Sequence, residues 1–502
     1  MSRPLPLRRL APVVLVLASL RLHAAPPALP APRTPEYYKN APAAAKSAPV
    51  LRGRAPWWSV FHDPALDALL CQTLNANQDI QQALARLLEA RAQARAAAAD
   101  YFPHLDAPLR ATRQRTTNTG PRQLGLFLGN NAPSASGTAG PFSALFSKPI
   151  ATQPLSITYN DFRAPLRLTY ELDVFGRIRA TVGQARANAQ AAEADRRALE
   201  LSLTAQAATG YFTVRALDAQ IEVLRRTANL RRTAVKLQRD RVEAGTANQL
   251  DLYRAQVELD NTQSDLTDTI RQRGEAENAL APLCGQSASA FHIPAQPLGQ
   301  RPPPPVPPGV PATLLAQRPD LAQAERKLQA AAEGIRAARA DLLPTFNIEG
   351  DAGLESAHFD QLFEGQSRTW MVEGTISIPI FEGGRNVANL RAAKARREEA
   401  FAAYHQAALT AFKEVENALV DLRQRATQAG FNESAAANAG RVAALSQQRY
   451  EEGQVSYFEV IDAQRLQLGA ELTRIQTLNA RYAATVDLIR ALGGKWDPVP
   501  NQ

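Results

Sequence analysis

The sequence predicts an α+β membrane protein in which a unit of helix, strand, strand and long helical hairpin occurs twice. Two observations lead to this prediction. Residues 166–281 and 380–497 contain no proline, although the chain has 35 of them. The two stretches also align with each other at an offset of 208 positions, which places Gly245 on Gly453. Tandem copies of long helices build an elongated, pseudo-symmetric molecule rather than a globule with one pocket.

The composition excludes several classes of protein. The 502 residues are 45% hydrophobic, 21% charged and 6% aromatic, with a formal net charge of +9. Basic and acidic residues are interspersed without a basic run, so we expect no nucleic-acid partner. The sequence has no Gly-rich phosphate loop, no metal-spaced His/Cys set and no nucleophile motif, so we expect no enzyme, no catalytic or metal-binding residue and no cofactor.

The N-terminus has the pattern of a secretory signal peptide, which we place at residues 1–25. Arg8 and Arg9 precede the apolar run Ala11–Leu20, and small residues follow it. About ten apolar residues are too few for a membrane-spanning helix, which needs roughly 20. We expect residues 26–63, rich in Pro and Ala at their start, to form an extended segment.

We place the first repeat at residues 64–289 and the second at 320–494. Each opens on an amphipathic helix. The two opening helices correspond at an offset of 241, so that Leu87 falls on Leu328 and Pro103 falls on Pro344. The remaining parts are a Pro-rich linker at 290–319 and a C-terminal tail at 495–502.

Four segments alternate apolar and polar side chains, two in each repeat. They lie at about 104–115, 165–175, 345–355 and 370–380. The pattern is that of a membrane β-barrel strand with apolar residues outside and polar residues inside. A half-buried hairpin of a soluble domain shows the same alternation. The secretory signal and the charged residues on the polar face favour the barrel.

One copy of the chain cannot close such a barrel. About eight strands are the smallest workable number, and an open sheet edge cannot sit in lipid. Three copies would give twelve strands. If the strands span a membrane, the protein must therefore be an oligomer, and in a three-copy form the helices would make a matching tunnel below the barrel.

The first strand pair has the longer loop. The repeat offset falls from 241 to 208 between its two strands, so this loop exceeds its counterpart by 33 residues. The inserted region, Thr116–Thr158, is rich in Gly, Asn, Ser, Pro and Thr. Long loops of membrane barrels lie outside the cell.

Each repeat closes with a helical hairpin, at 177–284 and 385–492. Apolar residues follow a 3-4 spacing along both, as in a coiled-coil seam. Gly245 and Gly453 interrupt the two patterns, and a short helix–Gly–helix connection makes an antiparallel hairpin. Each repeat therefore ends in a narrow helical tip.

Five motifs in chain order resemble one known family. They lie at Trp57–Leu66, Asn77–Ala92, Tyr170–Arg177, Gln317–Leu321 and Ile378–Arg385. In these motifs the chain resembles the TolC-like outer-membrane efflux channels of the OprM/NodT branch, over essentially the whole mature chain.

The resemblance implies a homotrimer with a 12-stranded outer-membrane β-barrel, continuous with a periplasmic α-helical barrel. It also implies an outer-membrane exit duct with a large periplasmic portion, acting passively in a tripartite efflux pump for drugs or other small molecules. A periplasmic adaptor protein would open its tip, and an inner-membrane pump would supply the cargo. Two alternatives remain: the exit duct of a type I protein secretion system, and a soluble periplasmic coiled-coil structural or adaptor protein. The stretches Trp57–Pro64 and Arg318–Asp320 favour the efflux branch.

The resemblance also implies roles for residues at the hairpin tips. The positions of the periplasmic aperture match Asp251, Tyr450, Glu459 and Asp462. The positions of the tip turns and of adaptor docking match Arg241, Gly245, Arg449 and Gly453. Three copies of a carboxylate around one axis would form a negative ring that favours cations. The alternative is that these are solvated residues of the helix ends.

The chain departs from the family pattern at two positions. Val455 stands where relatives often have an Arg two residues after the second tip glycine, which removes one member of the closing network. Leu20 stands where many relatives carry the Cys that receives a lipid. We therefore expect no acyl anchor at this position and a membrane attachment through the barrel and its surrounding lipid.

Overall fold

The computed structural model describes residues 34–35, 38–40, 56–115, 158–246, 248–306, 315 and 317–494. The predicted signal peptide with Leu20, the loop at 116–157 and the tail at 495–502 lie outside these residues. The chain divides into two compact units. A helical unit comprises residues 1–94, 183–335 and 392–502, and a strand unit comprises residues 95–182 and 336–391.

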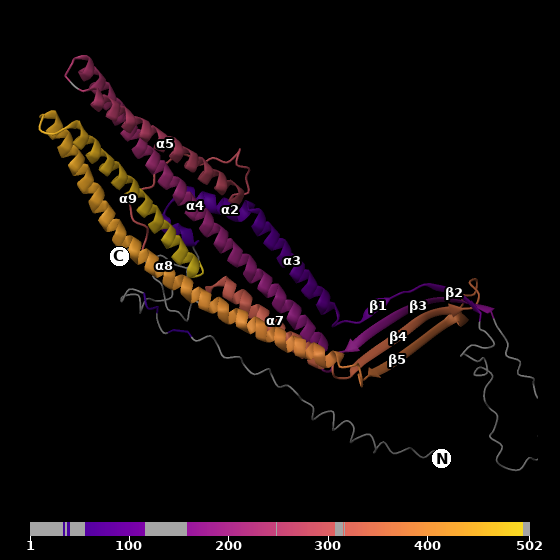
Figure 1. Ribbon diagram of the computed structural model, residues 1–502. Coiled ribbons are helices and arrows are strands. Elements are labelled where there is room, and N and C mark those ends of the chain that lie inside the picture. The colour runs from indigo at the N-terminus through magenta and orange to yellow at the C-terminus, as the bar shows by residue number, and fades with distance from the viewer. Residues whose placement is uncertain are drawn as a thin grey trace, which may run out of the picture. The chain divides into compact units, whose positions relative to one another are not determined.

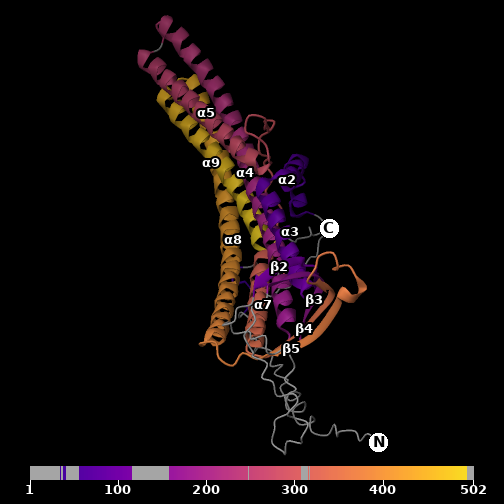
Figure 2. The ribbon, with the colours of Figure 1, turned by 90° about the vertical axis from the view of Figure 1, so that its right-hand side faces the viewer.

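Two helical hairpins dominate the helical unit, one from each repeat (Figure 1). The first joins α4 (Arg177–Glu243) to α5 (Gln249–Leu283), and the second joins α8 (Arg385–Glu451) to α9 (Tyr457–Ala491). Both begin where the sequence predicted and end within one residue of the predicted bounds. Figures 1 and 2 show both tips at the same end of this unit, with α5 beside α9. The shorter helices are η3 (Trp57–Phe61), α2 (Pro64–Ala76), α3 (Gln78–Ala99) and α7 (Pro319–Ala340).

The two hairpin tips have the same turn geometry. Gly245 and Gly453 have left-handed φ angles of 72° and 73°. In the first tip, the Thr246 N–H donates to the Arg241 carbonyl at 2.8 Å, and the second tip repeats this bond at the same distance. This is a Schellman cap, in which glycine avoids the steric cost that a Cβ would carry at positive φ. The two repeats therefore share this turn down to the same backbone hydrogen bond.

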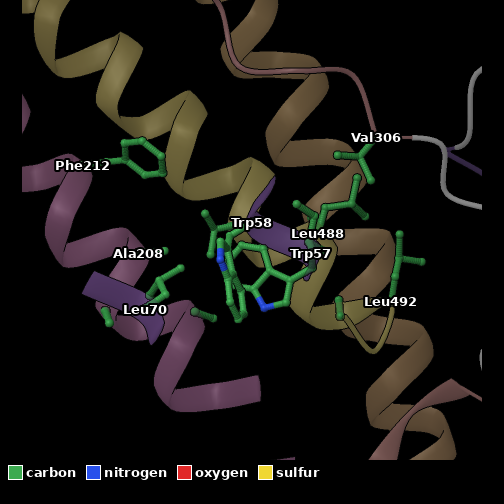
Figure 3. Packing of buried hydrophobic residues seen from close by; sticks show 14 of the residues in the cluster. Trp57, Trp58, Leu70, Ala208, Phe212, Val306, Leu488 and Leu492 are labelled. Carbon is green, nitrogen blue, oxygen red and sulfur yellow. The ribbon is translucent and has the colours of Figure 1, made fainter. Parts of the chain in front are cut away.

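The core of the helical unit forms around the N-terminal aromatic motif. Figure 3 shows Trp57 and Trp58 surrounded by Leu70, Ala208 and Leu488, which come from α2, α4 and α9. Asp63 also ties η3 and α2 to the hairpins, because it caps α2 and accepts a hydrogen bond from the Tyr211 hydroxyl at 2.7 Å. Small residues on the long helices leave room for these large rings.

The start of the linker between the repeats is held by buried charges. Arg273 donates to the Ile293 carbonyl and Arg215 to the Pro294 carbonyl, both at 2.6 Å. Asp218 pairs with Arg273 at 3.1 Å and accepts from the Gln296 N–H at 3.0 Å. Because each of these charged side chains has a partner, the extended segment packs on α4 and α5 without burying an unpaired charge.

The strand unit holds one antiparallel sheet. Its strands are β1 (His104–Asp106), β2 (Arg110–Arg115), β3 (Thr158–Leu172), β4 (Thr345–Ser356) and β5 (Arg368–Ser377). Strands β1 and β2 both pair with β3, β3 pairs with β4, and β4 pairs with β5. The pairing of β3 with β4 joins the two repeats. A short 3-10 turn, η6 (Gly365–Ser367), precedes β5.

The strand bounds differ from the predicted ones at several ends. The predicted strand at 104–115 is interrupted at 107–109, because Pro108 lacks an N–H for the ladder. The second strand spans Thr158–Leu172 rather than 165–175. The fourth strand was predicted to reach 380 but ends at Ser377, two residues before Pro379, since proline disfavours further pairing. With these bounds, each repeat still contributes one pair of antiparallel strands to the sheet.

Candidate functional site

The sheet separates charge from apolar surface. Side chains of successive residues point to opposite faces, so the strand register assigns each residue to a face. One face, here called the polar face, carries every carboxylate of the described strands: Asp106, Asp161, Glu171, Glu349, Asp351, Glu355 and Glu373. On it Arg167 pairs with Asp351 at 3.1 Å, and Arg163 pairs with Glu355 at 2.8 Å.

The opposite, apolar face is exposed. On β5, Trp370, Val372 and Ile376 are 79%, 71% and 61% exposed. Aromatic rings lie near both of its ends. Phe162 contacts Phe359 with ring centroids 5.6 Å apart, and Phe346 contacts Phe175 at 6.2 Å. An exposed apolar band between aromatic residues is the signature of a lipid-facing barrel wall.

The sheet has two open edges within the described chain. Strands β1 and β2 line one edge, and β5 lines the other. Unpaired backbone groups at such edges template further strand pairing. Since the apolar face requires lipid and lipid tolerates no open edge, the sheet is complete only in an assembly.

The hairpin tips bring two of the predicted site residues together. Tyr450 lies near the end of α8, and its hydroxyl accepts hydrogen bonds from the Gln238 amide at 2.8 Å and the Arg241 guanidinium at 2.9 Å, both on α4. The Arg241 guanidinium also lies 5.5 Å from the centre of the Tyr450 ring. These contacts join the first hairpin to the second.

The repeat partner of Arg241 behaves differently. Arg449 is exposed and donates to Gln454 in its own tip at 3.4 Å. The two arginines occupy equivalent positions in the duplication, yet only Arg241 crosses to the other hairpin. The tips are therefore symmetric in backbone and asymmetric in side-chain contacts.

The three predicted aperture carboxylates do not contact one another within one chain. Asp251 is half-buried in the first turn of α5 and pairs with Arg254 at 3.4 Å. The Arg254 guanidinium lies 5.4 Å from the ring of Phe458 on α9. Glu459 and Asp462 are exposed on α9. Any ring formed by these carboxylates therefore requires several copies of the chain.

A buried carboxylate below the tips was missed by the sequence reasoning. Glu258 on α5 pairs with Arg231 on α4 at 3.1 Å, and each side chain is 6% exposed. The Glu258 carboxylate also accepts from Arg465 Nε on α9 at 2.8 Å. Burial lowers the pKa of Arg231, and the attraction of Glu258 opposes that shift. One carboxylate thus holds three helices of two hairpins.

The heptad pattern of α4 contains a signal for two of its buried polar residues. Leu224, Ala228 and Val235 mark the buried seam of α4, and Arg231 and Gln238 continue its 3-4 spacing. A polar residue at a seam position is costly unless it finds a partner, so it indicates a specific buried contact. The heptad pattern does not indicate which residue of another helix makes this contact.

Tyrosine 457 completes the packing between the tips. It is buried against Ala228, Leu259 and Ile461, and its ring centre lies 5.4 Å from that of Tyr450. Burial, with a smaller contribution from Tyr450, raises the pKa of Tyr457 to about 12. Its hydroxyl is therefore neutral over the physiological range, and its side chain packs with apolar residues of the first hairpin, Ala228 and Leu259.

We predict that Tyr450→Phe loosens the tips. The change removes the acceptor shared by Gln238 and Arg241, and Gln238 is 1% exposed. Leaving a buried donor unpaired costs about 1–3 kcal/mol. Single-channel conductance of the variant should exceed that of the wild type. The control is Tyr253→Phe, since Tyr253 is 65% exposed and its hydroxyl has no partner in the described chain. Equal conductance of the two variants would contradict the role of the Tyr450 hydroxyl.

Two further properties of the described residues bear on function. No group of three or more His, Cys, Asp and Glu side chains in this part of the chain is placed to hold a metal ion. Among the helices in the described ranges, none has an apolar stretch long enough to cross a bilayer.

Comparisons with known proteins agree with this arrangement. A family model described as "Outer membrane efflux protein" matches residues 69–286 and 310–494. Outer membrane protein OprJ of Pseudomonas aeruginosa is 33% identical over 444 residues, which cover 88% of this chain and 86% of OprJ. The toluene efflux pump outer membrane protein TtgF of Pseudomonas putida is 30% identical over 446 residues, covering 89% of this chain and 86% of TtgF.

Solved structures share the fold. The outer-membrane channel OprN has a TM-score of 0.79 at 28% identity, and the match covers 94% of this chain and 100% of that one. The channel CusC has a TM-score of 0.77 at 27% identity, covering 94% and 99%. These matches confirm the predicted fold class, which combines a helical barrel with a β-barrel. The long helical hairpins, the lipid-facing sheet and the match across both repeats establish that this chain belongs to the outer membrane efflux protein family.

Proposed function

We propose that this protein is the exit duct of a tripartite efflux pump, conducting drugs or other small molecules passively across the outer membrane. The observation that carries the proposal is a sheet with an exposed apolar face and two open edges, joined through the chain to long helical hairpins. Its relatives include proteins named as efflux pump components, such as TtgF. The protein itself resides in the outer membrane, with a large periplasmic helical portion.

The working form proposed here is a homotrimer. Four strand positions per chain, with β1 and β2 sharing one, give twelve strands in three copies. The order of the strands makes this closure antiparallel, because β5 and the β1–β2 edge run in opposite directions. Closure pairs every edge and leaves no unsatisfied backbone in lipid. The exposed Trp370 and Val372 argue against the alternative of a soluble coiled-coil protein.

The aperture at the tips is proposed as the gate. At rest, Arg241 and Gln238 hold Tyr450, and the half-buried Asp251 lies beside Arg254. A periplasmic adaptor that docks on the tip turns at Gly245 and Gly453 would compete with these contacts, and an inner-membrane pump would deliver the cargo. The duct needs no chemistry of its own, so no catalytic group or cofactor is proposed.

The first test is single-channel conductance in a planar bilayer, comparing the wild type with Asp251→Ala/Glu459→Ala. We expect a small, cation-preferring conductance that rises severalfold in the variant, because a ring of carboxylates favours cations and holds the gate. The control is Glu398→Ala/Glu399→Ala, which removes two exposed carboxylates of α8 far along the chain from the tip.

The outcomes of this test separate the parts of the proposal. A wild-type protein that never inserts would overturn the duct. Insertion with the same conductance and ion preference in the variant and the wild type would keep the duct and reject the acidic gate.

A further inference from the structure

The loop between β4 and β5, residues 357–367, turns toward the apolar face of the sheet. Ser356, the last residue of β4, lies opposite Phe162 on β3 and therefore on that face. Its hydroxyl oxygen accepts a hydrogen bond from the His358 N–H at 3.2 Å. A serine that accepts from the backbone N–H two residues later forms a local turn. The chain therefore bends toward the apolar side as soon as β4 ends.

Two phenylalanines of this loop continue the apolar face. The ring of Phe359 meets that of Phe162 with centroids 5.6 Å apart and an angle of 68° between the planes. The ring of Phe363 meets that of Phe359 at 6.4 Å and 84°. Edge-to-face contacts of this kind are an arrangement that aromatic rings prefer. The three rings form an aromatic row that leads from β3 onto the loop.

The shape of the loop keeps the end of this aromatic row exposed. The Ser367 hydroxyl closes the loop by donating to the Gln361 carbonyl at 2.7 Å. Leu362 is 5% exposed, so its side chain packs inside the turn. Phe359 and Phe363 are instead 63% and 74% exposed. The loop thus has a buried apolar residue of its own and still presents two large rings on its surface.

An acidic residue follows each of these phenylalanines. Asp360 and Glu364 come one position after Phe359 and Phe363, and both are exposed. The loop therefore carries an apolar pair and an acidic pair, each spaced by four residues. An amphipathic segment of this kind suits a membrane boundary, where one side meets acyl chains and the other meets water.

The position of the aromatic row fits lipid rather than a second copy of the chain. Phe162 lies on β3, which pairs with β2 and β4 of its own chain. A second copy would pair at the open edges of the described sheet, which are formed by β1–β2 and by β5. The loop leans over β3 and so away from the β5 edge. It also joins the strand ends opposite those that connect to the periplasmic helices α7 and α8, which places it on the extracellular side.

We propose that Phe359 and Phe363 insert among the acyl chains of the outer leaflet and anchor the 357–367 loop to the membrane. Each ring offers about 150–250 Å² of surface, and removing apolar surface from water is favourable. The face that carries Phe162 is the lipid-facing one, so the aromatic row extends a lipid contact that the sheet already makes. Anchored in this way, the loop is held at the outer wall of the barrel and clear of its mouth.

Nitroxide spin labels test this anchor in the full-length protein, reconstituted in phosphatidylcholine vesicles. Cys71→Ser removes the exposed native thiol, and Cys284 is buried. A label at Phe363→Cys should collide severalfold more often with oxygen, which dissolves in acyl chains, than with a water-soluble nickel chelate. A label at Glu364→Cys is the matched control, since this neighbouring residue belongs to the acidic pair, and it should show the reverse preference.

The ring of Phe162 supplies a second test. Phe162→Ala removes the contact that holds Phe359 on the apolar face, so the label at Phe363→Cys should become severalfold more accessible to nickel. Phe346→Ala is the control, because it removes a ring from the opposite end of the same face and should leave the label unchanged. Heat-modifiable migration on a gel is the check that both variants fold. An unchanged label in Phe162→Ala would overturn the role of the aromatic row.

Two further outcomes would overturn the anchor itself. Equal nickel accessibility of the labels at Phe363→Cys and Glu364→Cys would place both sides of the loop in water. A label at Phe363→Cys that neither reagent reaches, with dipolar broadening between labels, would assign the aromatic row to a contact between copies. The assay needs no current through a channel, so its result is independent of the proposed duct.

Discussion

Gly353→Ala should abolish assembly of the trimer, whereas Gly374→Ala should leave it intact. Gly353 on β4 lies opposite Pro165 on β3. A Cβ at this position would lie 2.4 Å from both the Ala164 carbonyl oxygen and the Pro165 Cα. Both are backbone atoms, so no side chain can move aside. The strands must separate where the two repeats join, at a cost of about 1–3 kcal/mol or more in each of three copies.

The measurement is heat-modifiable migration on a gel, followed by channel formation in a planar bilayer. Gly374 on β5 is the matched control, because a Cβ there meets nothing within 4 Å. Gly350→Ala on β4 itself is a second control, since its nearest neighbours would lie at 3.9 Å. Normal assembly of Gly353→Ala would show that the register between β3 and β4 differs from the one described.

Glu258→Ala should destabilise the helical hairpins by about 3 kcal/mol, because it leaves the buried charge of Arg231 without its carboxylate partner. Arg465→Ala removes the partner on the other side of the same carboxylate, but its side chain is 53% exposed. Exposed partners contribute about 1 kcal/mol or less. The two variants therefore break the same network with different expected costs.

Hydrogen exchange of the amides in α4, α5 and α9 near the tips measures both effects. Glu258→Ala should also raise the channel conductance, since Glu258 holds α9 of the second hairpin through Arg465. The double variant Arg231→Met/Glu258→Leu should recover most of the stability, because well-packed apolar residues can replace a buried ion pair. Equal losses in Glu258→Ala and Arg465→Ala would contradict the distinction between a buried and an exposed partner.

The sequence-based predictions were most accurate for regular features. The repeat offset, the Gly245 and Gly453 turns and the start of each hairpin follow from local spacing, and the structure reproduces them within one residue. The ends of the strands were less accurate, since alternation continued past Pro379 while pairing did not. Pairing depends on backbone donors that the alternation of side chains does not report.

In the candidate site, too, the sequence predicted some residues and missed others. The family resemblance predicted Tyr450 and Arg241 as site residues. In the structure a hydrogen bond joins these two residues, which are 209 positions apart in the chain. The resemblance predicted neither Gln238 nor Glu258, although both are buried. The equivalence of Arg241 and Arg449 in the duplication also predicts identical contacts, which the structure does not have.

The sequence by itself determined the elements, the duplication and the two chemically distinct faces of the strands, because periodicity records which side of a helix or strand is buried. Only the tertiary structure decided that Arg231 meets Glu258 and that Arg241, not Arg449, reaches across to the neighbouring hairpin. Such contacts depend on how the helices are rotated and offset against each other. That arrangement is set by the packing of the whole helical unit, and no local pattern encodes it.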